Sequence, residues 1–227
     1  HAGVGMSALE RGLERLSHVV ARAEFVVSHL LGTEKVNANL VLRPPGDMRL
    51  ELLSPTDDLL AIFVANEAET RMFQRGSDHC IVQVGCSGNL EGLLPVPILV
   101  KDLVSLLLGG GPPQLVSSQP MTWNETQGTL VLSEEGHSSG KRVVHLDPCS
   151  FDVVGVEWWK ERELTVRAKL NQEKTIHFVV PDEGVEVKMT FVVRDAEMEV
   201  EDDAFTFQCP GGVEEQVYRC VHEENSP

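Results

Sequence analysis

Histidine, serine and carboxylate side chains that could do acid–base or nucleophilic chemistry are scattered along this chain. His145 and Asp147 alternate on one predicted strand, His177 stands on another, and Ser138 and Ser139 lie between predicted strands. The sequence contains no GxSxG elbow, HExxH helix or dinucleotide-binding glycine pattern. We therefore predict no catalytic residue, no metal site and no cofactor. A hydrolase would require the fold to bring a histidine, a carboxylate and a nucleophile into one cleft.

The five cysteines are a second source of chemistry. Cys80 and Cys86 lie close together around a predicted turn, and Cys209 and Cys220 flank a Pro-Gly-Gly sequence. Either spacing could close a hairpin or loop, which would leave Cys149 free. Two interpretations stay open: the disulfides Cys80–Cys86 and Cys209–Cys220, or five reduced and mostly buried cysteines. The chain has no CxxC pair, which argues against a zinc ribbon or a thioredoxin-type site.

The charge of the chain restricts its partners. The 227 residues include 35 acidic and 19 basic side chains, for a formal net charge of −16. Nucleic acid and anionic membrane surfaces both select for clustered cations, so neither is expected as the main partner. Residues 195–224 hold ten acidic side chains against Arg219 alone. This run predicts either a solvated sheet edge or a surface for a basic partner, such as another protein.

Period-two alternation of apolar and polar residues predicts a mainly β chain with antiparallel strands. In residues 185–194, for example, Val193 falls on the apolar face and Arg194 on the polar face. The predicted strands are 22–31, 35–43, 48–52, 59–65, 70–74, 79–84, 129–132, 142–146, 151–159, 164–169, 175–180, 185–194 and 205–208.

Two segments have helical periodicity instead. Residues 7–21 repeat apolar side chains at helical spacing after a capping box. Residues 98–108 do the same within a Pro-rich insert, 87–109, that ends at a triple glycine. No linker or repeat divides the chain. We therefore predict one domain, 1–227, in which strands over 22–84 and 121–220 flank the helical insert.

The order of these elements and several short motifs resemble the LolA/LolB superfamily of bacterial lipoprotein carriers and receptors. Residues 40–44 (LVLRP) and 48–51 (MRLE) are similar to the L-x-L-R-P…F-R-W-E stretch of that superfamily. Residues 52–55 (LLSP), 94–97 (LPVP) and 106–109 (LLLG) resemble its Ser-Pro, Pro-Ile-Pro and helix-end elements. Residues 203–214 resemble the C-terminal stretch of LolA. The resemblance extends in order over most of the chain.

The resemblance implies a mainly β (α+β) fold: a strongly curved, half-open antiparallel β-barrel with a helical lid. An apolar cavity between the sheet and the lid would hold acyl chains of lipoproteins or lipids. Burial is favourable by about 0.8 kcal/mol per methylene, so such a cavity needs no specific polar chemistry. The expected lining comes from the strands and the lid helix: Leu40, Leu42, Met48, Leu50, Leu52, Leu99, Leu103, Val187, Met189 and Phe191.

Two further roles follow from the same resemblance. Arg43, the Arg before the Pro, is expected to latch the helical lid. The loop with Pro55, Leu59 and Leu60 matches the loop through which LolB passes cargo to a membrane. Its tip, residues 56–58, is Thr-Asp-Asp here where LolB presents leucine. An acidic tip favours a soluble or shuttling binder over a protein that presses into lipid.

The expected function is non-enzymatic binding or transfer of acyl chains in the bacterial cell envelope. The alternative is an interaction, sensor or scaffold module of the envelope that reuses the fold without lipid cargo. The sequence begins at His1 and not at Met, so we expect either a periplasmic protein or an outer-membrane lipoprotein whose lipid-anchored N-terminus lies upstream.

Overall fold

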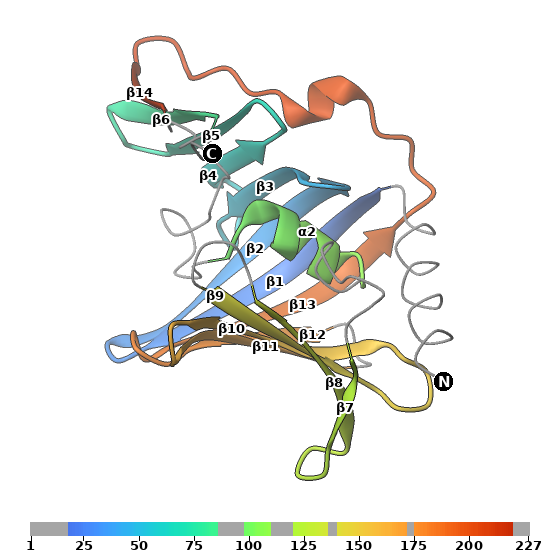
Figure 1. Cartoon of the computed structure of the whole chain (residues 1–227). Helices are drawn as coiled ribbons and strands as arrows, with labels where there is room; N and C mark the ends of the chain where they lie inside the picture. The colour runs from blue at the N-terminus through green and yellow to red at the C-terminus, as the bar shows by residue number, and fades with distance from the viewer. Residues whose placement is uncertain (1–17, 86–97, 110–119, 136–139, 172–174, 220–227) are drawn as a thin grey trace, which may run out of the picture.

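The structure, a computed structural model, describes residues 18–85, 98–109, 120–135, 140–171 and 175–219. These residues form one strongly curved sheet with a single α-helix, α2, inside its curve (Figure 1). This arrangement confirms the predicted half-open barrel with a helical lid. The described helices, α2 and one short 3₁₀ turn, include none that is long and apolar enough to cross a membrane.

The strands of the first half are β1 (Val19–His29), β2 (Gly32–Arg43), β3 (Asp47–Leu53), β4 (Leu59–Ala65), β5 (Glu69–Gln74) and β6 (His79–Val84). The helix α2 (Val100–Leu107) follows. The later strands are β7 (Thr122–Asn124), β8 (Thr129–Glu135), β9 (Gly140–Leu146), β10 (Val153–Lys160), β11 (Glu163–Leu170), β12 (Thr175–Val180), β13 (Val185–Asp195) and β14 (Glu214–Arg219).

The sheet joins two meanders through the first and the last long strands. β1 pairs with β2 on one side and with β13 on the other, so the order is β14-β6-β5-β4-β3-β2-β1-β13-β12-β11-β10-β9-β8-β7. Neighbouring strands are antiparallel, except that β14 pairs with β6 in parallel. β14 and β7 are the two edges of this sheet, and no described strand pairs them with each other.

The concave face holds the core. Leu40 and Leu42 of β2 lie opposite Leu50 and Met48 of β3, and all four are almost completely buried. The alternating inner positions of β1 and β13 continue this surface. α2 packs onto it through Leu103, Leu106 and Leu107, among others. The period-two alternation of the strands thus identified the face that the helix covers.

An ion-pair cluster attaches α2 to the sheet. Asp102, in the first turn of α2, is buried and lies 2.6 Å from Nη1 of Arg142 on β9. The same guanidinium lies 2.8 Å from Glu134 on β8. All three side chains are at most 12% exposed. Because buried carboxylates need counter-ions, Arg142 fixes where the start of α2 sits on the sheet.

Two predicted elements differ from the structure. Val19–Ala21, expected at the end of a helix, begin β1, because Val19 and Ala21 are buried alternately between β2 and β13. The rest of that predicted helix, 7–17, lies outside the described residues. The predicted strand 205–208 is wrong: Phe205 ends a 3₁₀ turn, Asp202–Phe205, and the three residues after it are irregular.

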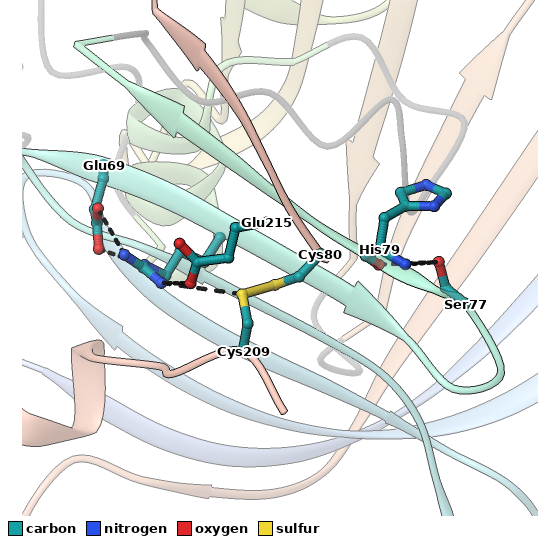
Figure 2. The surroundings of a disulfide bond; sticks show 7 residues. Glu69, Ser77, His79, Cys80, Cys209 and Glu215 are labelled. Atoms are coloured by element: carbon teal, nitrogen blue, oxygen red, sulfur yellow. Dashed lines mark hydrogen bonds and ion pairs between the residues drawn. A yellow bond between two sulfur atoms is a disulfide. The ribbon is translucent and has the colours of Figure 1, made fainter. Parts of the chain in front are cut away.

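A C-terminal strap, residues 196–213, crosses the convex side from β13 to the edge strand β14 (Figure 1). Phe205 is its buried anchor, and the Cα atoms of Cys209 and Cys80 lie 6.0 Å apart across a disulfide. Figure 2 shows this bond with Glu69 and Glu215 beside it. Nη1 of Arg71 on β5 donates to Glu215 at 3.0 Å and lies 4.0 Å from the sulfur of Cys209. The strap therefore covers the outer surface of the first meander.

The cysteine pairings expected from spacing are corrected by this bond. Cys80 pairs with Cys209 and not with Cys86, and Cys209 is consequently unavailable to Cys220. The physical reason is the parallel β6–β14 pairing, which returns the C-terminal segment to the strand that carries Cys80. Cys86 and Cys220 lie outside the described residues. Cys149 is free and exposed, as expected.

Candidate functional site

A cavity of about 310 Å³ lies between the C-terminal end of α2 and the concave face of the sheet. Its volume is at the lower end of the range for small-molecule sites. Its apolar walls are Leu106 and Leu107 of α2 with Ile176 of β12 and Phe191 of β13. Polar residues of the β9–β10 connection, including Asp147 and Ser150, stand along the same cavity. It can therefore hold a chain of apolar groups with a polar end.

A β-bulge in β13 supplies this cavity with a cation. Val193 pairs with Arg22 and Phe191 with Ala23, so Val192 has no partner on β1. The extra residue reverses the alternation: Val193 is 57% exposed, whereas Arg194 lies opposite the buried Ala21 and lines the cavity. The sequence pattern predicts the reverse, with Val193 on the apolar face and Arg194 on the polar face. A bulge of this kind typically re-aims a side chain at a functional site.

The guanidinium of Arg194 has no carboxylate partner among the described residues. Its Cζ lies 5.5 Å from the centre of the Phe191 ring. Burial lowers the pKa of Arg194 because water is partly excluded from the charged group. Asp147, on the same cavity, accepts hydrogen bonds from the backbone N–H groups of Cys149 and Ser150 at 2.8 and 2.9 Å. These bonds lower the pKa of Asp147 and hold its Oδ1 atom within its own turn.

The structure brings nine of the ten predicted lining residues into one apolar cluster. Of these nine, Phe191 lines the 310 Å³ cavity. Leu40, Leu42, Met48, Leu50, Leu52, Leu103, Val187 and Met189 are buried in the core beside it. Their role in holding lipid stays a prediction. Leu99 is the exception: it precedes the first residue of α2, is 37% exposed and is not part of the cluster.

Arg43 has a different contact from the expected one. It lies on the convex face, opposite Asp47, and its guanidinium pairs with Asp47 and with Asp202 of the strap. Its Cζ is 4.5 Å from the ring centre of Phe205. Arg43 therefore holds the strap, and in the described part of the chain the arginine that binds the lid helix is Arg142. The sequence could not separate these roles because both arginines stand on strands.

The loop with Pro55, Leu59 and Leu60 is compact and polar at its tip. The backbone N–H of residue 54 donates to the carbonyl of residue 58 at 2.8 Å, and Arg22 of β1 pairs with Asp57. Leu60 packs against the core, whereas Leu59 is 38% exposed. Among the leucines that the structure describes, the most exposed are Leu30 and Leu31, at 93% each, between β1 and β2. A role of this loop in cargo transfer stays a prediction.

A second cavity of about 310 Å³ lies on the convex face around His145. Nδ1 of His145 lies 3.3 Å from the hydroxyl of Thr129, and Nε2 lies 3.8 Å from Glu157. Glu157 accepts hydrogen bonds from Arg167 and Trp159 and is beyond hydrogen-bond distance of the ring. Burial lowers the pKa of His145, which makes it a weaker base. This geometry lacks the base–carboxylate hydrogen bond that activates a hydroxyl nucleophile.

The other polar residues of the sequence analysis are not brought together. His177 pairs with Glu186 on the surface, 3.1 Å apart, and Ser138 and Ser139 lie outside the described residues. Among the residues that the structure describes, no three His, Cys, Asp or Glu side chains form a group that could bind a metal ion.

Comparison with known proteins finds similarity in fold and not in sequence. No protein-family model and no curated protein matches the chain. A LolA superfamily protein from Nitrosomonas europaea superposes with a TM-score of 0.63 at 10% identity, over 89% of this chain and 97% of that one. A DUF1329 family protein from Desulfovibrio piger gives 0.63 at 10% identity, over 89% and 96% of the chains.

A protein domain from Vibrio parahaemolyticus, described as an outer membrane lipoprotein-sorting domain, superposes with a TM-score of 0.60 at 11% identity. The match extends over 89% of this chain and 95% of that chain. The superpositions include nearly the whole of each neighbour and agree with the curved sheet and lid helix described above. The chain has the LolA/LolB-like fold.

Proposed function

We propose that this protein binds an acyl chain of a lipid or lipoprotein in the cavity between α2 and the concave face, without catalysing a reaction. The observation that carries the proposal is the 310 Å³ cavity itself, which opens beside an apolar core cluster. Each methylene moved from water to such a wall contributes about 0.8 kcal/mol, so a few methylenes give measurable affinity. The neighbour described as a lipoprotein-sorting domain is consistent with this cargo.

The disulfide supports an envelope location. A bond between Cys80 and Cys209 is typical of proteins in an oxidising compartment such as the bacterial periplasm. The proposed location is therefore the periplasm, or the outer membrane if a lipid anchor precedes His1. A protein that shuttles between membranes would keep its cargo enclosed and would not press this loop into lipid. The polar tip of the 54–58 loop agrees with such a role.

A protein partner for the acidic C-terminal segment remains the second hypothesis. Part of that acidic charge is used within the chain, since Asp202 pairs with Arg43 and Asp195 accepts backbone hydrogen bonds from residues 197 and 198. The acidic side chains of this segment that remain exposed would recognise a basic surface.

A cavity-filling substitution tests the proposal. Leu170 is half-buried at the end of β11 and lines the cavity, so Leu170→Trp should block it. We expect the affinity for a dansylated undecanoic acid, measured by fluorescence titration, to fall about tenfold or more. Loss of contact with two methylenes suffices for that change. Leu164→Trp, at the other end of β11 and also half-buried, is the matched control and should bind the probe normally. Equal binding by both variants would place the probe elsewhere.

A further inference from the structure

The position of Arg194 indicates the charge of the ligand. This inference rests on the proposed function. Three observations meet at this residue. The bulge at Val192 turns Arg194 inward, the described residues supply it with no carboxylate, and it stands in a cavity with apolar walls. A cation that is desolvated without a partner costs free energy. An unpaired cation that lines a cavity beside apolar walls is suited to an anion that arrives with the ligand.

We propose that Arg194 binds the anionic head group of an amphiphile whose acyl chain lies along Leu106, Leu107 and Ile176. The guanidinium presents a planar set of N–H donors that can bind a carboxylate or a phosphate through two parallel hydrogen bonds. Phe191 holds the guanidinium from one side and offers its ring to the chain. The ligand class is therefore a fatty acid or an acidic phospholipid, and not a neutral glyceride or ester.

Neighbouring charges are consistent with this assignment. Asp147 and Asp152 also line the cavity, but neither lies within ion-pair distance of Arg194. One oxygen of the Asp147 carboxylate, Oδ1, accepts hydrogen bonds from the backbone N–H groups of its turn. Asp195, next to Arg194 in the sequence, accepts hydrogen bonds from the backbone N–H groups of residues 197 and 198. Arg194 thus forms no ion pair with any of these three carboxylates, and its guanidinium can pair with an anionic group of the ligand.

Two ligands that differ only in head-group charge test the inference. In isothermal titration with the full chain, laurate should bind about tenfold to a hundredfold more tightly than methyl laurate, because a hydrogen bond to an ionised group is stronger than one to an ester. Sodium acetate, which supplies the carboxylate without the chain, should not bind measurably. Tight binding of acetate would overturn the inference by showing an anion site independent of the acyl chain.

Substitutions then assign the effect to Arg194. Arg194→Gln should lower the affinity for laurate about tenfold or more and leave the affinity for methyl laurate unchanged. Arg194→Lys, which keeps the charge but not the paired donors, should fall between. Arg162→Gln, which removes an exposed arginine from the β10–β11 turn, is the matched control and should change neither affinity. The methyl laurate titration also checks that each variant retains a formed cavity.

The outcomes separate this inference from the proposed function. If laurate and methyl laurate bind the unmodified protein equally, the head-group assignment is overturned and acyl-chain binding stands. If Arg194→Gln weakens both ligands equally, Arg194 is a structural residue and the assignment again fails. If neither ligand binds, both the proposed function and this inference are overturned.

Discussion

Replacing Arg142 by methionine is expected to lower the free energy of unfolding by about 3–5 kcal/mol, since removing one partner of a buried ion pair leaves an uncompensated charge. Arg142 lies between the buried carboxylates of Asp102 on α2 and Glu134 on β8. Methionine keeps much of the apolar stem and removes only the counter-ion. The loss should appear as a lower midpoint in urea denaturation, with a similar slope.

An exposed arginine provides the control for this experiment. Arg75 lies 3.8 Å from Asp58, and both side chains are more than 60% exposed. Arg75→Met should change the stability by at most about 1 kcal/mol, because water screens such a pair. Equal effects of the two substitutions would show that α2 is not held by the Asp102–Arg142–Glu134 cluster.

Removing the disulfide is expected to have the second large effect. The bond between Cys80 and Cys209 closes a loop with a sequence separation of 129 residues. Cross-links of native proteins typically contribute about 2–5 kcal/mol, and long loops lie toward the upper end. The double substitution Cys80→Ser with Cys209→Ser should therefore lower the free energy of unfolding by that amount. Thermal and urea unfolding both measure the loss.

Reduction provides an independent check on the same bond. Dithiothreitol should destabilise the unmodified protein to about the level of the double variant and should leave the double variant unchanged. Cys149→Ser, at the free and exposed cysteine, should change neither result. If dithiothreitol leaves the unmodified protein as stable as before, then Cys80 and Cys209 are not joined in solution.

The alternation of apolar and polar residues within single segments predicted most strands of this sheet. The strands from 35–43 to 185–194 correspond to β2–β6 and β8–β13. The alternation of buried and exposed residues is clearest in β2 and β13, whereas residues 61–65 of β4 are buried on both faces. The edge strands β7 and β14 carried no such pattern: β7 has three residues, and β14 is mostly exposed. β14 pairs with β6, which is distant in sequence, and β7 pairs with β8 through backbone hydrogen bonds.

The residues whose roles differ from the predictions depend on contacts with segments that are distant in sequence. A register shift of one residue on β13 moved Arg194 inward and Val193 outward, and alternation read along a single strand cannot detect a bulge that pairing with β1 creates. Arg43 matched a family motif, yet the strap that it binds lies 159 positions further along the chain. Likewise Cys80 found its partner through the parallel β14, and not through the nearest cysteine.

Native mass spectrometry of the full chain titrated with laurate tests the central claim most directly. If the cavity between α2 and the concave face binds an acyl chain, the protein should gain one laurate per molecule, and Leu170→Trp should lose that adduct while Leu164→Trp retains it. Failure of the unmodified protein to take up laurate, or equal adducts on all three proteins, would contradict the proposal that this cavity is an acyl-chain site.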